Sequence, residues 1–221
     1  MNFPSSLFIF GDDWLWLGNL TLFILIMRAL QFANWRELFN NNIRCNALIG
    51  LMFCTPVFWL LNAGIHPGFN FHLIGATLFT LMFGWPIALI MLSLVMLGIW
   101  IFSGIDLVTL GINGLVMLVV PILFSEGLLR FSQRYLKKNP FLFVLFNGFV
   151  CAGLAILMMT IATTLLLLAL SGYTWTVIQH HYLIPAPGLI FIEAFATGAL
   201  ITGFTVSQPE AVMNFKSIEF K

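Results

Sequence analysis

Few residues in this chain could do chemistry, and His72 is the clearest of them. It opens the apolar run His72–Phe83, "HLIGATLFTLMF". A neutral imidazole is a common ligand of zinc, copper, iron and nickel ions, which makes His72 a candidate metal ligand. A histidine that caps a helix or anchors a loop through hydrogen bonds would give the same pattern. His66 lies six residues earlier and could add a second imidazole or face solvent.

Two further polar residues lie inside apolar runs. Glu193 stands in "FIEAFATGALITGF" and Asn113 in "LGINGLVML". Ionisable groups in a membrane usually face the interior of the bundle or a water-filled cavity. Glu193 is expected about six residues into its helix. It could be partly solvated near the interface or hydrogen-bonded to neighbouring helix groups, or it could pair with an imidazole or a cation in an outer-facing cavity. Glu126 needs no such account, because Arg130 follows it at i+4 and predicts a helical ion pair.

These residues belong to a chain whose composition predicts an integral membrane protein. Of its 221 residues, 61% are hydrophobic and only 8% are charged, and its mean hydropathy is +1.03. A soluble domain has about 25% charged residues. The formal net charge of +1 gives no electrostatic case for nucleic acid.

A membrane-crossing helix needs about 20 mostly apolar residues. The chain offers about seven such segments, so we expect an all-α, polytopic membrane bundle. A single transmembrane domain would cover residues 1–206, and a short cytoplasmic tail would cover 207–221. The expected spans are about 14–32, 44–63, 71–83, 86–102, 107–129, 141–170 and 187–206.

The third expected span, 71–83, is short. Its 13 residues would give roughly 20 Å of helix, against a hydrocarbon core of roughly 30 Å. It could pair with the span at 86–102 through the "GWP" turn, or the two could form a re-entrant hairpin. Short segments at membrane depth are tolerated where protein or water covers them, which places His72 inside the bundle.

Basic residues predict the orientation. All nine lysines and arginines fall between the first two spans, between the fifth and sixth, or in the tail, or lie at the ends of spans beside these segments. Because lysine and arginine favour cytoplasmic loops, we expect the N-terminus outside and the C-terminus in the cytoplasm of a multi-pass protein of the cell (inner) membrane. His180 and His181 would then lie in an outer loop.

Three motifs in chain order resemble those of the CbiM/NikM-like permeases. They are His72-Leu73-x-Gly75-Ala76, Leu110-Gly111-x-Asn113, and Glu193-Ala194 followed by Thr197-Gly198. These permeases are the substrate-capturing components of energy-coupling factor transporters for cobalt and nickel. The similarity covers about residues 66–206 and is greatest to a divergent branch of the family.

The resemblance implies a metal-ion site on the outer face. Family members begin Met-His, and their N-terminal amine and second-residue histidine bind the metal together with the helix-opening histidine. This chain has Asn2 at the second position. The implied metal-binding residues are His72, the amine of Met1, His66 and Glu193, and Asn2 and Asn113 are expected along the substrate pathway.

The most favoured function is uptake of a transition-metal ion as substrate, with no resident cofactor assigned. The resemblance implies a separate ATPase and a transmembrane coupling subunit as partners. A membrane scaffold or partner protein that has lost metal transport is the alternative. An enzyme is not expected, because no G-x-x-x-x-G-K-[ST], H-E-x-x-H or G-x-S-x-G motif is present.

Overall fold

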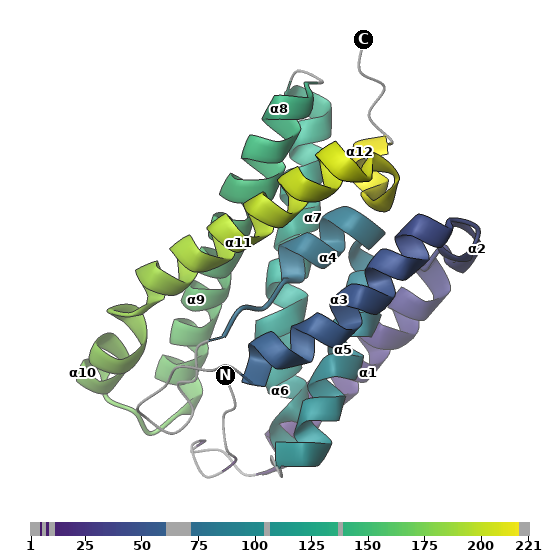
Figure 1. The fold of residues 1–221 in the computed structure, drawn as a ribbon. Helices are drawn as coiled ribbons and strands as arrows, with labels where there is room; N and C mark the ends of the chain where they lie inside the picture. The colour runs from purple at the N-terminus through teal and green to yellow at the C-terminus, as the bar shows by residue number, and fades with distance from the viewer. Residues whose placement is uncertain are drawn as a thin grey trace.

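Long apolar helices dominate the structure, a computed structural model that describes Ser5, Phe8 and residues 12–60, 72–103, 107–136 and 139–216. Within these residues six helices are long and apolar enough to cross a membrane. They run over Asp13–Phe32, Asn42–Leu60, Trp85–Phe102, Leu107–Tyr135, Pro140–Leu170 and Trp175–Ser207. The expected polytopic helical bundle is therefore confirmed (Figure 1).

Twelve α-helical segments make up this bundle in the described residues. They are α1 (Asp12–Phe32), α2 (Trp35–Phe39), α3 (Asn42–Leu60), α4 (Ala76–Phe83), α5 (Trp85–Ser103), α6 (Leu110–Gly114), α7 (Val120–Tyr135), α8 (Pro140–Leu142), α9 (Cys151–Leu170), α10 (Trp175–Ile178), α11 (Ala186–Ser207) and α12 (Met213–Lys216).

Three of the long helices contain π-helical stretches. These stretches are Leu115–Val119, Phe143–Val150 and Gln179–Leu183. Each joins two α-helical segments: α6 to α7, α8 to α9, and α10 towards α11. Such π-helical turns change the direction of a helix without ending it.

The last long helix begins earlier than the sequence predicts. It starts at Trp175 rather than Pro187, so His180 and His181 are helical and the expected outer loop there is wrong. The backbone amide of Ile184 donates to the carbonyl of Gln179, and this bond continues the helix up to Pro185. Glu193 consequently lies near the middle of a 33-residue helix, deeper than expected.

The third predicted span is short, as expected, but only its second half is helical. α4 has eight residues, or about 12 Å of helix, and residues 72–75 before it are not helical. α5 has 19 residues and is long enough to cross, so the two do not form a hairpin of short helices. The chain turns between them at Gly84, whose φ of 83° favours glycine.

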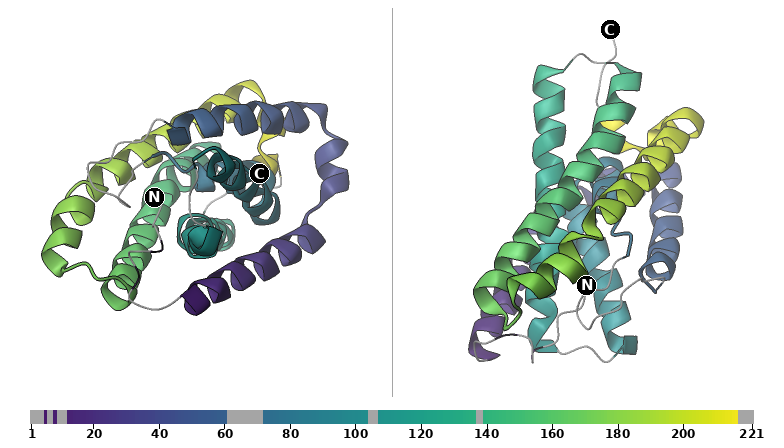
Figure 2. Two further views of the ribbon diagram at one scale, coloured as in Figure 1. Left: turned by 90° about the horizontal axis from the view of Figure 1, so that it is seen from below. Right: turned by 90° about the vertical axis from the view of Figure 1, so that its left-hand side faces the viewer.

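α4 lies inside the bundle. All eight of its side chains are buried, and Ala76, Phe79, Leu81 and Met82 are completely inaccessible. Figure 2 shows this segment surrounded by longer helices. A short helix whose backbone ends would otherwise meet lipid is therefore covered by protein on all sides.

α1 and α6 cross at very short distance. A Cβ atom on Gly111 would lie 2.1 Å from the backbone nitrogen of Asn19, so only glycine fits at this crossing. The Asn19 side chain accepts a hydrogen bond from the Gly111 amide at 2.7 Å and donates to the carbonyls of Leu107 and Val108. Asn19 thereby pairs the backbone groups at the start of α6.

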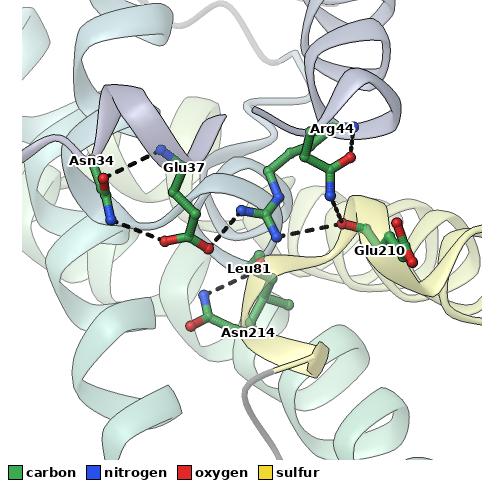
Figure 3. Close-up of polar contacts among 7 residues, drawn as sticks. Asn34, Glu37, Arg44, Leu81, Glu210 and Asn214 are labelled. Carbon is green, nitrogen blue, oxygen red and sulfur yellow. Dashed lines mark hydrogen bonds and ion pairs between the residues drawn. The ribbon is translucent and has the colours of Figure 1, made fainter. Parts of the chain in front are cut away.

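The opposite end of the bundle, where α2, α8 and α12 lie, is tied together by Arg44 (Figure 1). The side chain of Arg44, 3% exposed, bonds Glu37 at 2.9 Å and the backbone carbonyl of Glu210 at 3.4 Å (Figure 3). Asn214 donates to the carbonyls of Thr80 and Leu81 in α4. The described part of the predicted tail, up to Lys216, thus packs against α3 and α4.

The predicted ion pair on α7 is confirmed at this same end. Nε of Arg130 lies 2.8 Å from Oε1 of Glu126. Arg36, Arg44, Arg130, Arg134 and Lys216 also belong to elements at this end. The structure therefore gathers these basic residues at one end, while their position on the cytoplasmic side stays a prediction.

Candidate functional site

His72 lies in the non-helical segment that leads into α4. Its ring is partly buried, and the ring centroid lies 4.9 Å from that of Trp59 near the end of α3, with 38° between the planes. Nδ1 is 3.3 Å from the carbonyl oxygen of Leu73. The imidazole is thus packed on one face against an aromatic ring, which restricts its orientation.

A metal ion binds the neutral form of an imidazole, which keeps one ring nitrogen with a lone pair. His72 can therefore offer one ring nitrogen as a ligand while Nδ1 bonds to the carbonyl oxygen of Leu73.

Glu193 binds the backbone of the His72 segment from the opposite side. Oε2 accepts a hydrogen bond from the Ile74 amide at 2.8 Å, and Oε1 accepts one from the Gly75 amide at 2.7 Å. The glutamate is 1% exposed. The described contacts of Glu193 are therefore hydrogen bonds and not an ion pair. Its partners are backbone amides of the segment before α4.

The peptide groups around Ile74 are therefore held on two sides. The indole nitrogen of Trp59 donates to the Ile74 carbonyl at 3.4 Å, while Glu193 receives the Ile74 amide. α3 and α11 supply these two side chains, and the segment passes between them (Figure 1). We call this arrangement, formed by Trp59, Ile74, Gly75 and Glu193, the backbone clamp.

The carboxylate of Glu193 also faces the N-terminus of α4. Gly75 is the residue before α4 and has a φ of 74°, a conformation that glycine adopts without strain. The first amides of a helix have no partners within the helix and carry partial positive charge. A buried carboxylate next to this end of α4 therefore satisfies both the hydrogen bonds and the charge.

Small residues allow α11 to place Glu193 correctly. A Cβ atom on Gly148 would lie 3.4 Å from Cα of Gly198, so the helices that contain them cross with their backbones close together. Ala194 lies beside Gly153 in the same crossing. The small residues of "ATGALITGF" thus form a packing surface.

Asn113 lies elsewhere in the bundle. It is in α6 and 3% exposed, close in sequence to the crossing of Gly111 with Asn19. Its place along a substrate pathway stays a prediction. The other predicted site residues, Met1, Asn2 and His66, lie outside the described residues.

The described ranges hold no group of three or more histidine, cysteine, aspartate or glutamate side chains that could hold a metal ion. Within these ranges His72 supplies an imidazole, and Glu193 is next to it through the backbone of the clamp.

Sequence reasoning missed the role of Trp59. It is 5% exposed and contacts both His72 and Ile74. No local pattern signals this contact, because it depends on how the chain returns between α3 and α4.

The fold and the clamp define a multi-pass helical membrane protein in which a partly buried histidine segment leads into a buried short helix. The family model described as "Cobalt uptake substrate-specific transmembrane region" (CbiM) matches residues 8–211. The chain therefore belongs to the CbiM family, and the resemblance noted in the sequence is confirmed.

Two solved structures have the same fold. The crystal structure of a truncated transition metal transporter superposes with a TM-score of 0.71 at 19% identity, covering 93% of this chain and 98% of the other. That of a transition metal transporter gives 0.69 at 20% identity, covering 93% of each chain. No curated protein matches the chain.

Proposed function

We propose that this protein captures a divalent transition-metal ion from the outer side of the membrane as its substrate. The observation that carries the proposal is the placement of His72, an imidazole packed against Trp59 in the segment that leads into the buried helix α4 of a CbiM-family bundle. Square-planar nitrogen ligation favours nickel or copper, and cobalt is the ion in the family's description.

The remaining ligands come, in this proposal, from the segments that precede His72 in the chain. The amine of Met1 and the imidazole of His66 are the candidates, and Asn2 and Asn113 contribute to the substrate pathway. Because Asn2 offers no imidazole, the site would differ from one that uses a second-residue histidine, and His66 would supply the second ring.

Energy for release would come from a separate ATPase with its transmembrane coupling subunit. The sequence contains no phosphate-binding G-x-x-x-x-G-K-[ST] motif, so the chain itself offers no site of this kind for ATP. The inner end of the bundle, with its basic residues, is the side from which such a module would act.

Metal binding by variants of the full chain tests this function. The purified protein would be loaded with Ni²⁺ or Co²⁺, dialysed, and analysed by elemental mass spectrometry and by titration calorimetry. We expect about one ion per chain for the wild type and a loss of at least about 100-fold in affinity for His72→Ala, because one of few ligands is removed.

His180→Ala is the matched control, since it removes an exposed imidazole in the π-helical stretch Gln179–Leu183 that is not among the proposed ligands. Its metal affinity should equal that of the wild type. Wild-type protein without bound metal, or His72→Ala with unchanged affinity, would contradict the proposal and favour the scaffold alternative.

A further inference from the structure

We infer that Glu193 positions the His72 segment for metal capture through the backbone clamp and does not itself bind the metal. This inference rests on the proposed function. It assigns to Glu193 a role different from the metal ligand that the sequence suggests.

The carboxylate oxygens of Glu193 are both within 2.8 Å of backbone amide nitrogens, and the side chain is buried. Each oxygen already accepts a hydrogen bond from a backbone amide. These amides have no partner within α4, because Ile74 and Gly75 precede the helix. Turning the carboxylate towards a metal would leave the amides of Ile74 and Gly75 without partners in a dry interior, which is costly.

The clamp fixes the backbone two residues after His72. Trp59 holds the carbonyl of Ile74 and Glu193 holds its amide, so this residue cannot rotate without breaking bonds on both sides. Trp59 also contacts the ring of His72 itself. The direction in which the imidazole points is therefore set by α3 and α11 together.

The N-terminus of α4 carries a partial positive charge that would repel a divalent cation bound at His72. The carboxyl group of Glu193, whose two oxygens accept the amides of Ile74 and Gly75, places electron-rich oxygens at this end of α4 and offsets this repulsion without direct contact with the cation. Half-helices at membrane depth commonly direct their N-termini at anions, and here the anion belongs to the protein.

Glu193→Gln removes the charge and one acceptor while keeping the shape. A glutamine amide accepts through one oxygen and offers NH₂ where the second acceptor was, so one of the two amides loses its partner. We expect Co²⁺ affinity to fall about 10- to 100-fold, as for other groups that orient a metal ligand. Glu193→Asp, which keeps the charge but is shorter, should lie between wild type and Glu193→Gln.

The absorption spectrum of bound Co²⁺ distinguishes a positioning residue from a ligand. At saturating metal, Glu193→Gln should give the wild-type spectrum, since the donor atoms are unchanged. A changed spectrum would show that Glu193 is a ligand, and an unchanged affinity would show that it does not position the site. Either result overturns the inference.

Hydrogen exchange tests the clamp in the absence of metal. The amides of Ile74 and Gly75 should exchange faster in Glu193→Gln than in the wild type. Glu126→Gln is the matched control, because this carboxylate bonds only to Arg130 among the described contacts, on another helix. Equal exchange in wild type and Glu193→Gln would contradict the inference.

A second variant covers the case in which Glu193→Gln does not fold. Trp59→Phe keeps an aromatic ring against His72 and removes the indole donor to Ile74. Trp59→Phe should lower the Co²⁺ affinity by a smaller factor than Glu193→Gln and leave the Co²⁺ spectrum unchanged. An unchanged affinity would contradict the role of the clamp. Should wild-type protein bind no metal, the proposed function fails, whereas the exchange experiment still decides whether the clamp exists.

Discussion

At the scale of single residues, polar side chains form hydrogen bonds with backbone amides and carbonyls that have no partner within a helix. Glu193 receives the amides at the start of α4, and Asn19 pairs three backbone groups at the start of α6. Both side chains supply hydrogen-bond partners to backbone groups near the start of a helix. An interior without water makes each of these partners necessary.

Asn19→Ala tests this requirement away from the metal site. Removal of the side chain takes away its hydrogen bonds to the Gly111 amide and to the carbonyls of Leu107 and Val108. We expect the free energy of unfolding in detergent to fall by about 1–2 kcal/mol.

Thr21→Ala is the control for this prediction. Thr21 lies on the same helix, is exposed, and bonds only to the carbonyl of Leu17 in its own turn. It should change stability by less than about 0.5 kcal/mol. Equal stability of the two variants would show that Asn19 contributes little to the crossing.

Sequence alone located His72 and Glu193 but did not reveal their relation. Both stand out because ionisable residues are rare in apolar runs. Glu193 accepts a hydrogen bond from the amide of Ile74, 119 positions away in the chain. The periodicity of the sequence carries no information about such a contact. Trp59 was equally hidden, since an aromatic residue near a helix end is ordinary in membranes.

At the scale of elements, the sequence predicted where helices lie better than where they end. The first, second and fourth spans agree with α1, α3 and α5 to within a few residues. The last span was predicted from residue 187, whereas the helix begins at Trp175 and the amide of Ile184 bonds to the carbonyl of Gln179 ahead of the prolines. Tertiary packing also shortened α4, whose sequence is apolar from residue 73 onwards.

The Arg44 contacts predict how the C-terminal segment is held. Arg44→Ala should loosen residues 208–216, because it removes a buried bond to the Glu210 carbonyl and the ion pair to Glu37. We expect faster hydrogen exchange of these residues and a loss of about 1–3 kcal/mol in stability.

Arg36→Ala is the appropriate comparison for Arg44→Ala. Arg36 is an exposed arginine on α2, close in sequence to Glu37. Its removal should leave exchange in residues 208–216 unchanged. The same exchange rates in both variants would mean that Arg44 does not hold this segment.

At the scale of the whole molecule, the two ends of the bundle differ in their content of basic residues. Arg44 and the basic turns of α7 lie at the end with α2 and α12, whereas α6 and α10 lie at the other (Figure 1). The positive-inside rule predicts that the first end is cytoplasmic. In this orientation α12, which bonds to α4 through Asn214, lies at the cytoplasmic end.

Single-cysteine labelling tests this orientation. In a variant with Cys45, Cys54 and Cys151 replaced by alanine, an impermeant thiol reagent should label Thr174→Cys on intact cells. Gln208→Cys should be labelled only after the membrane is permeabilised. The reverse pattern would contradict the orientation and would place the candidate metal site on the cytoplasmic side.

The central claim is that His72 binds the transported metal, and X-ray absorption of the Ni²⁺-loaded protein tests it most directly. The wild type should show the outer-shell scattering of imidazole, Glu193→Gln should show the same scattering at full loading, and His72→Ala should show it reduced or absent. Imidazole scattering that is the same in His72→Ala and in the wild type would contradict the account.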